Sequence, residues 1–218
     1  MRMDVVRELA PELVDEAWEF YRDAFDELRV RAVQRHVMHR HEFEAQMADD
    51  RVLKLVGLED GRVVGLATLT DDLAAVPLIS PDYFAHRWPQ LYADRRIWYV
   101  VFIATRSGRA GVGMFVQLIR GIVERVKTND GMIAADICAY NESEYDLPEM
   151  LRRASGRVAG SARRELLDSQ SFWLYEFPAA SWAGPVPRRA ATSAGTASAV
   201  RQRASNSAAG TARPHSQP

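Results

Sequence analysis

Hydrophobic residues follow two periods along this chain, and these periods divide it into strands and helices. Residues 97–103, Ile-Trp-Tyr-Val-Val-Phe-Ile, form an uninterrupted β-branched and aromatic run, which is typical of a central strand buried on both faces. Further on, apolar residues recur every three or four positions from Phe115 to Val126, whereas Gln117 and Arg120 fall on the opposite side. This second pattern predicts an amphipathic helix that packs on the sheet.

The same reading predicts the remaining elements. They are a strand over 3–9, a helix over 11–28, a short helix over 42–48, hairpin strands over 51–58 and 62–70, a strand over 132–140, a helix over 144–154, and two final extended segments over 157–166 and 169–177. Asp60-Gly61 forms the hairpin turn. Three prolines interrupt residues 71–96, which indicates a long functional loop or short helices. The aromatic residues there suit a lid over a pocket, a patch of core or a dimer contact.

Composition predicts one globular domain over residues 1–177 and a disordered tail over 178–218. The tail contains no Leu, Ile or Phe and cannot bury enough apolar surface to order itself. The formal net charge is −1, and because the tail carries five arginines and no acid, the domain itself carries about −6. This charge argues against nucleic-acid binding and suits a cationic, amine-bearing substrate.

Cys138 is the sole cysteine, so an intrachain disulfide and a thiolate-rich zinc site are excluded. The histidines His36, His39 and His41 lack the spacing of a metal site, and we expect them on a solvated face or lining an acceptor site. No apolar stretch is long enough to span a membrane. We therefore expect a soluble cytoplasmic protein without membrane contact or a bound metal.

The loop 106–113, Arg-Ser-Gly-Arg-Ala-Gly-Val-Gly, joins the central strand to the amphipathic helix. Glycines at a helix start leave its first amides open to an anion, so the loop indicates a phosphate-bearing ligand. Residues 113–115, Gly-Met-Phe, lack the Lys and hydroxyl that a Walker loop requires. The glycine order and the preceding hairpin also differ from a dinucleotide-binding fingerprint, which argues against an oxidoreductase.

The order of elements over residues 3–177 resembles the GNAT superfamily of acyl-CoA-dependent N-acyltransferases. That family's motif reads Gln or Arg, two variable residues, Gly, one variable residue, then Gly or Ala. Arg106 takes its first position, Gly111 its second glycine position, and Gly113 a further glycine common in the family. Arg109 replaces the first glycine. It would either point outward and add a cation near the phosphates, which we expect, or mark a loop that binds coenzyme A poorly.

The resemblance implies an α/β fold with a mixed, mostly antiparallel central sheet flanked by helices on both faces. It implies an acyltransferase that moves an acetyl or short acyl group from acetyl-CoA, or another acyl-CoA, to an amine of a small molecule or a protein; a homodimer stays open. The backbone of 102–105 would pair with the pantetheine arm where two strands splay apart. The cofactor-binding residues it implies are Ile103, Ala104, Thr105, Arg106, Gly108, Arg109, Ala110, Gly111, Val112, Gly113 and Asn141.

Two other functions fit the same resemblance. One is a catalytically degenerate module that binds acyl-CoA for regulation or interaction, and the other is acyl transfer to a different acceptor, such as synthesis of an acylated signal molecule. The central strand carries no carboxylate, and Pro148 stands where many family members have a Tyr. Tyr140, Tyr145 and Asp136 are the substitutes near the proposed cleft. Tyr145 could equally be a packing residue, and Asp136 could make a structural hydrogen bond to a neighbouring strand. The sequence therefore assigns no catalytic residue.

Overall fold

The computed structural model describes residues 1–77, 79–106 and 108–175, with only the backbone for Arg109 and Ala110. The chain divides into one unit over Met1–Phe172 and a second over Trp173–Pro218. In the second unit, residues 173–175 carry no regular secondary structure. The tail predicted over 178–218 lies outside the described residues.

Five strands form one sheet in the order β1-β2-β3-β4-β5. Their bounds are β1 Arg2–Val6, β2 Leu53–Glu59, β3 Arg62–Thr70, β4 Ile97–Thr105 and β5 Met132–Ala134. The first four strands pair antiparallel, and β5 lies parallel to β4. The prediction of a mixed, mostly antiparallel sheet is therefore confirmed.

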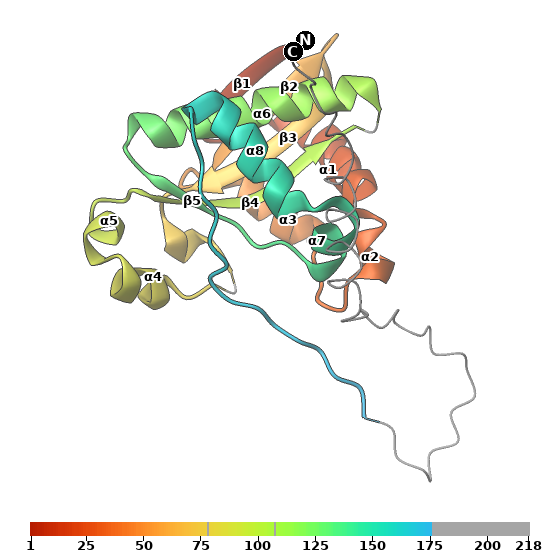
Figure 1. The fold of residues 1–218 in the computed structure, drawn as a ribbon. Helices are drawn as coiled ribbons and strands as arrows, with labels where there is room; N and C mark the ends of the chain where they lie inside the picture. The colour runs from red at the N-terminus through yellow and green to blue at the C-terminus, as the bar shows by residue number, and fades with distance from the viewer. Residues whose placement is uncertain (78, 107, 176–218) are drawn as a thin grey trace, which may run out of the picture. The chain divides into compact units, whose positions relative to one another are not determined.

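Helices cover both faces of this sheet (Figure 1). They are α1 Pro11–Phe25, α2 Leu28–Arg31, α3 Arg40–Ala48, α4 Pro81–Arg87, α5 Pro89–Ala93, α6 Arg109–Thr128, α7 Ala139–Tyr145 and α8 Leu147–Ala159, with a 3-10 turn η1 at Leu73–Ala75. On one face, Met114, Leu118 and Ile122 of α6 are buried against the sheet. On the other face, Tyr21 of α1 and Phe43 of α3 are buried. The apolar stripe of α6 is the one that its periodicity predicts.

The proline-rich segment 71–96 folds into η1, α4 and α5 and is not a long loop. Ser80 caps α4 through its side chain, and Pro81 occupies the first turn, where its missing N–H costs nothing. Phe84 then joins Ile97 and Tyr99 of β4 in a third cluster of buried residues. Of the alternatives for this aromatic segment, the patch of core is present.

The C-terminal third departs from the prediction. The strand predicted over 132–140 ends at Ala134, and residues 139–145 are helical. The helix α8 continues to Ala159 because Leu151, Ala154 and Val158 keep the helical spacing, and Gly160, with φ of 90°, ends it.

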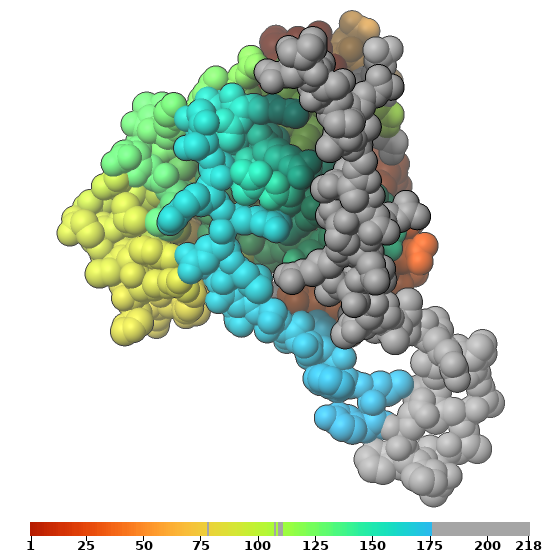
Figure 2. All heavy atoms as spheres, in the orientation of Figure 1, coloured from red at the N-terminus to blue at the C-terminus, as the bar shows by residue number. Residues whose placement is uncertain are grey.

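The extended segments predicted over 157–166 and 169–177 form no strand in the part that the structure describes. Within this stretch, Glu165 and Leu167 contact α4: Arg87 pairs with Glu165 at 2.5 Å, and Tyr83 donates to the Leu167 carbonyl at 3.5 Å. Figure 2 shows the cyan segment that follows α8 next to the yellow segment around α4. Residues 160–171 carry few apolar side chains that could pack a sixth strand on the sheet, and the apolar residues Phe172 to Tyr175 are exposed. Among the described residues, no helix is long and apolar enough to cross a membrane.

Candidate active site

The strands β4 and β5 pair over three residues each and then separate. Their parallel register covers Ile97↔Met132, Trp98↔Ile133 and Tyr99↔Ala134. Beyond Tyr99, β4 runs on to Thr105 with β3 as its partner on one side, while the chain after Ala134 leaves the sheet. Within the described residues, the opposite edge of β4 is thus free of strand pairing from residue 100 to 105. Such an edge offers backbone donors and acceptors to a ligand.

A β-bulge interrupts β4 at the start of this free edge. Thr68 pairs with Phe102 and Leu69 pairs with Val100, so Val101 is the extra residue in the bulge. A bulge leaves the extra residue's backbone outside the ladder and re-aims the neighbouring side chains. Val101 accordingly packs against both the cluster that contains Phe102 and the cluster that contains Tyr99.

A cleft of about 390 Å³ opens beside the free edge. It draws residues from five elements: Ala24 and Phe25 of α1, Ile103, Ala104 and Thr105 of β4, Phe115 of α6, Asn141 and Tyr145 of α7, and Leu147 and Met150 of α8. Four of the predicted site residues, Ile103, Ala104, Thr105 and Asn141, meet here. Asn141 reaches the cleft from a helix, although the sequence predicts it just after a strand.

The glycine loop leads from the end of β4 into the N-terminus of α6. Gly108 has φ of 86°, a conformation that favours glycine, and its carbonyl accepts the Val112 N–H at 3.2 Å. A Cβ on Gly108 or on Gly113 would meet no atom within 4 Å, so both face open space. Arg106 is exposed at the entrance to this turn. The side chains of Arg109 and Ala110 lie outside the described residues, and the predicted outward direction of Arg109 stays a prediction.

Of the three proton-transfer substitutes, Tyr145 alone lines the cleft. Its ring meets the Tyr140 ring edge-on at 5.9 Å. The Tyr140 hydroxyl donates to Glu27 at 2.8 Å, and its hydrogen bonding with Tyr145 and Glu27 raises the pKa of Tyr140. The Tyr140 hydroxyl thus interacts with both Glu27 and Tyr145, and Tyr145 is itself 56% exposed.

The third substitute, Asp136, lies where β4 and β5 separate. The Tyr99 hydroxyl donates to Asp136 Oδ1 at 2.8 Å, and Asp136 Oδ2 lies 4.0 Å from Nδ1 of His36. Burial, together with the Asp136 charge, raises the pKa of Tyr99. The phenol therefore stays a neutral donor to the carboxylate. Sequence patterns gave no signal for this contact, because Tyr99 reads as one more residue of a buried strand.

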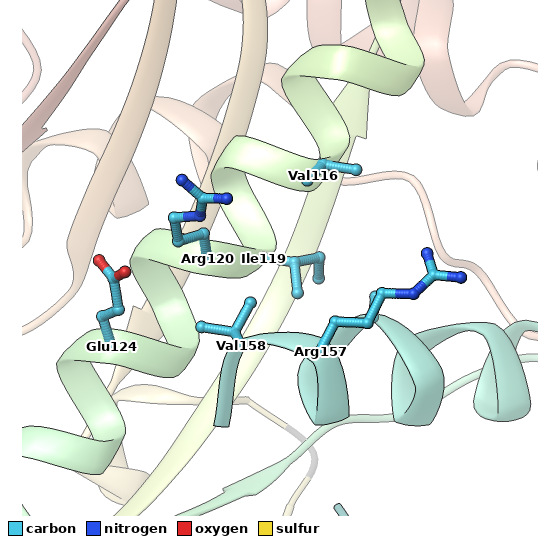
Figure 3. Close-up of a pocket in the computed structure, with 7 residues that line it drawn as sticks. Val116, Ile119, Arg120, Glu124, Arg157 and Val158 are labelled. Atoms are coloured by element: carbon cyan, nitrogen blue, oxygen red, sulfur yellow. The ribbon is translucent and has the colours of Figure 1, made fainter. Parts of the chain in front are cut away.

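A second hollow, of about 360 Å³, lies between α6 and α8. Figure 3 shows Ile119 of α6 and Val158 of α8 between the two helices, with Arg120 and Arg157 on either side of them. It contains none of the predicted site residues. No group of three potential metal ligands occurs among the described residues.

No family model and no curated protein sequence matches the chain. Its structural neighbours include aminoglycoside acetyltransferases and a putative acetyltransferase. An aminoglycoside 6'-N-acetyltransferase from Enterococcus faecium has 14% identity and a TM-score of 0.42, and the match covers 62% of this chain and 61% of that one. AAC(6')-Iy, solved with a bisubstrate analogue, CoA-S-monomethyl-acetylneamine, has 17% identity, a TM-score of 0.47, and coverage of 81% and 100%.

An aminoglycoside acetyltransferase from an uncultured soil metagenomic sample, solved with sisomicin, has 10% identity, a TM-score of 0.45, and coverage of 80% and 96%. The chain thus spans less than two thirds of the Enterococcus neighbour's length and nearly all of the other two. These likenesses concern the arrangement of helices and strands alone.

Proposed function

We propose that this protein is an N-acyltransferase that moves an acetyl or other short acyl group from coenzyme A to an amine. The observation that carries the proposal is the free edge of β4, which lies beside a cleft and leads directly into the N-terminus of α6. An extended amide-bearing arm would pair with such an edge as an added strand, and a pyrophosphate would lie at the helix start.

The residues present fit coenzyme A. The open space at Gly108 and Gly113 gives an anion access to the first amides of α6, and the guanidinium of Arg106 adds a positive charge. The backbone of 103–105 would hold the pantetheine arm, with Asn141 facing it across the cleft. Phe115 and Met150 supply the apolar wall that covers the arm's methylene groups.

The remaining chemistry falls to the backbone of β4 and to Tyr145. Acyl-CoA would supply the acyl group already activated as a thioester. A backbone N–H at the Val101 bulge, free of the strand ladder, would polarise the carbonyl. Tyr145, which lines the cleft and is more than half exposed, would give a proton to the departing sulfur. The negative charge of the domain favours a cationic amine as the acceptor.

A module that binds acyl-CoA without turnover is the second candidate, because β4 carries no carboxylate between Ile97 and Thr105. Two measurements on the full chain separate the candidates. The first is the melting temperature with coenzyme A and with acetyl-CoA, which rises when a ligand binds the folded state. The second is thiol release from acetyl-CoA with a panel of a polyamine, an aminoglycoside and a lysine peptide.

The proposal expects a rise in melting temperature and thiol release with at least one amine. A rise without release from any amine favours the binding module. If saturating coenzyme A leaves the melting temperature unchanged, both functions are wrong.

A further inference from the structure

Three side chains from distant parts of the sequence meet at the point where β4 and β5 separate. Tyr99 comes from β4, Asp136 from the segment after β5, and His36 from the connection between α2 and α3. The Tyr99 hydroxyl donates to one oxygen of Asp136, and the other oxygen faces Nδ1 of His36 at 4.0 Å. That separation suits an ion pair and is longer than a hydrogen bond.

The backbone of this connection is held in place from α1. The Tyr21 hydroxyl donates to the His36 carbonyl at 3.3 Å and accepts the Met38 N–H at 3.0 Å. The Tyr21 ring in turn packs on Phe102 of β4, with ring centroids 4.9 Å apart. His36 is therefore fixed to the same strand that carries the bulge, although it lies in a segment without regular secondary structure.

The cluster lies next to the proposed reaction centre. Tyr99 is the last β4 residue paired with β5, and Val101, the bulged residue, follows two positions later. Two residues of extended strand span about 7 Å. Val101 packs against the cluster of buried residues that contains Tyr99, so both residues lie on the same face of β4. The glycine loop and Phe115, which would hold coenzyme A, belong to α6 on the other face.

We infer that His36 is the general base that takes a proton from the amine acceptor, that Asp136 faces the resulting imidazolium, and that Tyr99 positions Asp136. The inference rests on the proposed function and identifies the amine side of that site. It also names the acceptor as an amine that arrives protonated, because Asp136 is a carboxylate 58% exposed at the side chain and able to meet an ammonium group.

The proton and electron balance is simple. The ammonium loses one proton to Nε2 of His36, and its lone pair then attacks the thioester carbonyl. The C–N bond forms, the C–S bond breaks with its electron pair leaving on sulfur, and the second proton lost by nitrogen balances the one that sulfur gains. His36 returns its proton to solvent. In the intervening state the Asp136 carboxylate faces the imidazolium at 4.0 Å.

Within the described residues, Asp136 is the carboxylate that lies against the imidazole, from the β5 side. From α1, the Tyr21 hydroxyl contacts the backbone carbonyl of His36 and not its ring. The neighbouring Arg35 is bound to Glu42 of α3 through two hydrogen bonds of 2.5 and 2.7 Å, which neutralises both.

The test compares His36→Gln, Asp136→Asn and Tyr99→Phe with the control His41→Gln in the full chain. His41 is exposed beside the same connection and stacks on His39 at 5.8 Å. We expect His36→Gln to lower kcat/KM by about 100-fold or more, the usual contribution of a general base. The fall of kcat/KM toward low pH should disappear with it. Asp136→Asn and Tyr99→Phe should lower kcat/KM about tenfold and move that limb along the pH axis.

All four variants should keep the rise in melting temperature with coenzyme A, because none of the substituted residues lines the cleft that holds it. His36→Gln with wild-type kcat/KM and an unchanged low-pH limb would overturn the inference while leaving the proposed function standing. A wild-type protein that neither binds coenzyme A nor releases thiol would overturn the proposed function, and this inference with it. Loss of coenzyme A binding in His36→Gln would also overturn the inference, since His36 would then be a structural residue.

Discussion

The carbonyl oxygen of Arg106 lies against the α-carbon of Gly111, so that a Cβ on Gly111 would be 1.6 Å from that oxygen. No side chain fits there unless the backbone moves. This contact closes the glycine loop onto the first turn of α6 and fixes where its amides point. Gly111 is required by a close approach of two backbone segments, which is the reason the proposed phosphate site depends on it.

Gly111→Val should therefore open the loop and abolish the rise in melting temperature with coenzyme A. Gly111 belongs to none of the three clusters of buried residues, so circular dichroism should keep its native helix signal. Gly113→Ala is the matched control, because a Cβ at Gly113 meets nothing within 4 Å. It should keep most of the coenzyme A effect and raise stability by about 0.5–1 kcal/mol through helix propensity. Equal binding by Gly111→Val would show that the loop is a turn without a ligand.

Tyr145→Phe tests the proton donor for sulfur. Removing the hydroxyl should lower kcat about tenfold to 100-fold, with little change in the coenzyme A effect on melting temperature, because the ring still lines the cleft. Tyr140→Phe is the control, since its hydroxyl already donates to Glu27 at 2.8 Å. The measurement is thiol release at saturating amine. A larger loss of kcat in Tyr140→Phe than in Tyr145→Phe would show that Tyr145 is not the proton donor.

Much of the fold could be predicted because it is encoded locally. The turn at Asp60 and Gly61, with φ of 51° and 77°, and the three-and-four spacing of α6 both arise from near neighbours in the sequence. The segment after Ala134 was predicted wrongly, because a mostly apolar run such as residues 132–140 has the pattern of a strand whether or not a partner strand pairs with it. The separation of β4 and β5 depends on tertiary contacts, which no local sequence pattern predicts.

The candidate site divides in the same way. Ile103 to Thr105 and the glycines follow one another in the chain, so a motif could predict them. The contact between Tyr99 and Asp136 joins residues 37 positions apart, and His36 enters from a third element. Their meeting depends on the bulge in β4 and on the placement of His36 by Tyr21, and neither has a sequence signature.

The side chain of Met114 fills the space above two glycines of the sheet. A Cβ on Gly57 would lie 2.3 Å from its sulfur, and Met114 is itself fully buried. Met114→Ala should destabilise the protein by about 2–5 kcal/mol by leaving a cavity. Gly57→Ala should cost about 1–3 kcal/mol by overpacking. The double variant should be more stable than the sum of the two costs predicts, because the new methyl group enters the vacated space.

Urea denaturation of the four proteins in this cycle measures the coupling. Gly57→Ala combined with Ile122→Ala is the control. Ile122 is buried in the same cluster as Met114, but the three atoms nearest to a Cβ at Gly57 all belong to Met114. That pair should be additive within about 0.5 kcal/mol. Additivity in the Met114 pair would mean that the glycine and the methionine do not share one space.

Lys54 gives the stability a dependence on alkaline pH. Its side chain is fully buried, with Nζ donating to the carbonyls of Arg7 and Asp49 at 2.6 Å each. Burial lowers the pKa of Lys54 from 10.5 to about 8. Between pH 8 and 10.5 the unfolded chain therefore binds a proton that the folded protein has released, so the free energy of unfolding rises with pH across this window. Below pH 8 both states are protonated and the cost of burying the charge is fully present.

The free energy of unfolding should rise by about 2 kcal/mol between pH 8 and 10. Each pKa unit corresponds to about 1.4 kcal/mol, and part of the shift lies above pH 10, where tyrosines also titrate. Lys54→Met should remove the rise between pH 8 and 10, although it leaves two carbonyls without their donor and lowers stability overall. Lys127→Met, on the exposed side of α6, is the control and should keep the rise. Urea denaturation at pH 7, 8, 9 and 10 measures all three proteins. The wild-type free energy of unfolding could instead stay constant or fall from pH 8 to 9.5, in parallel with that of Lys54→Met. That result would show that Lys54 keeps its ordinary affinity for protons in the folded state.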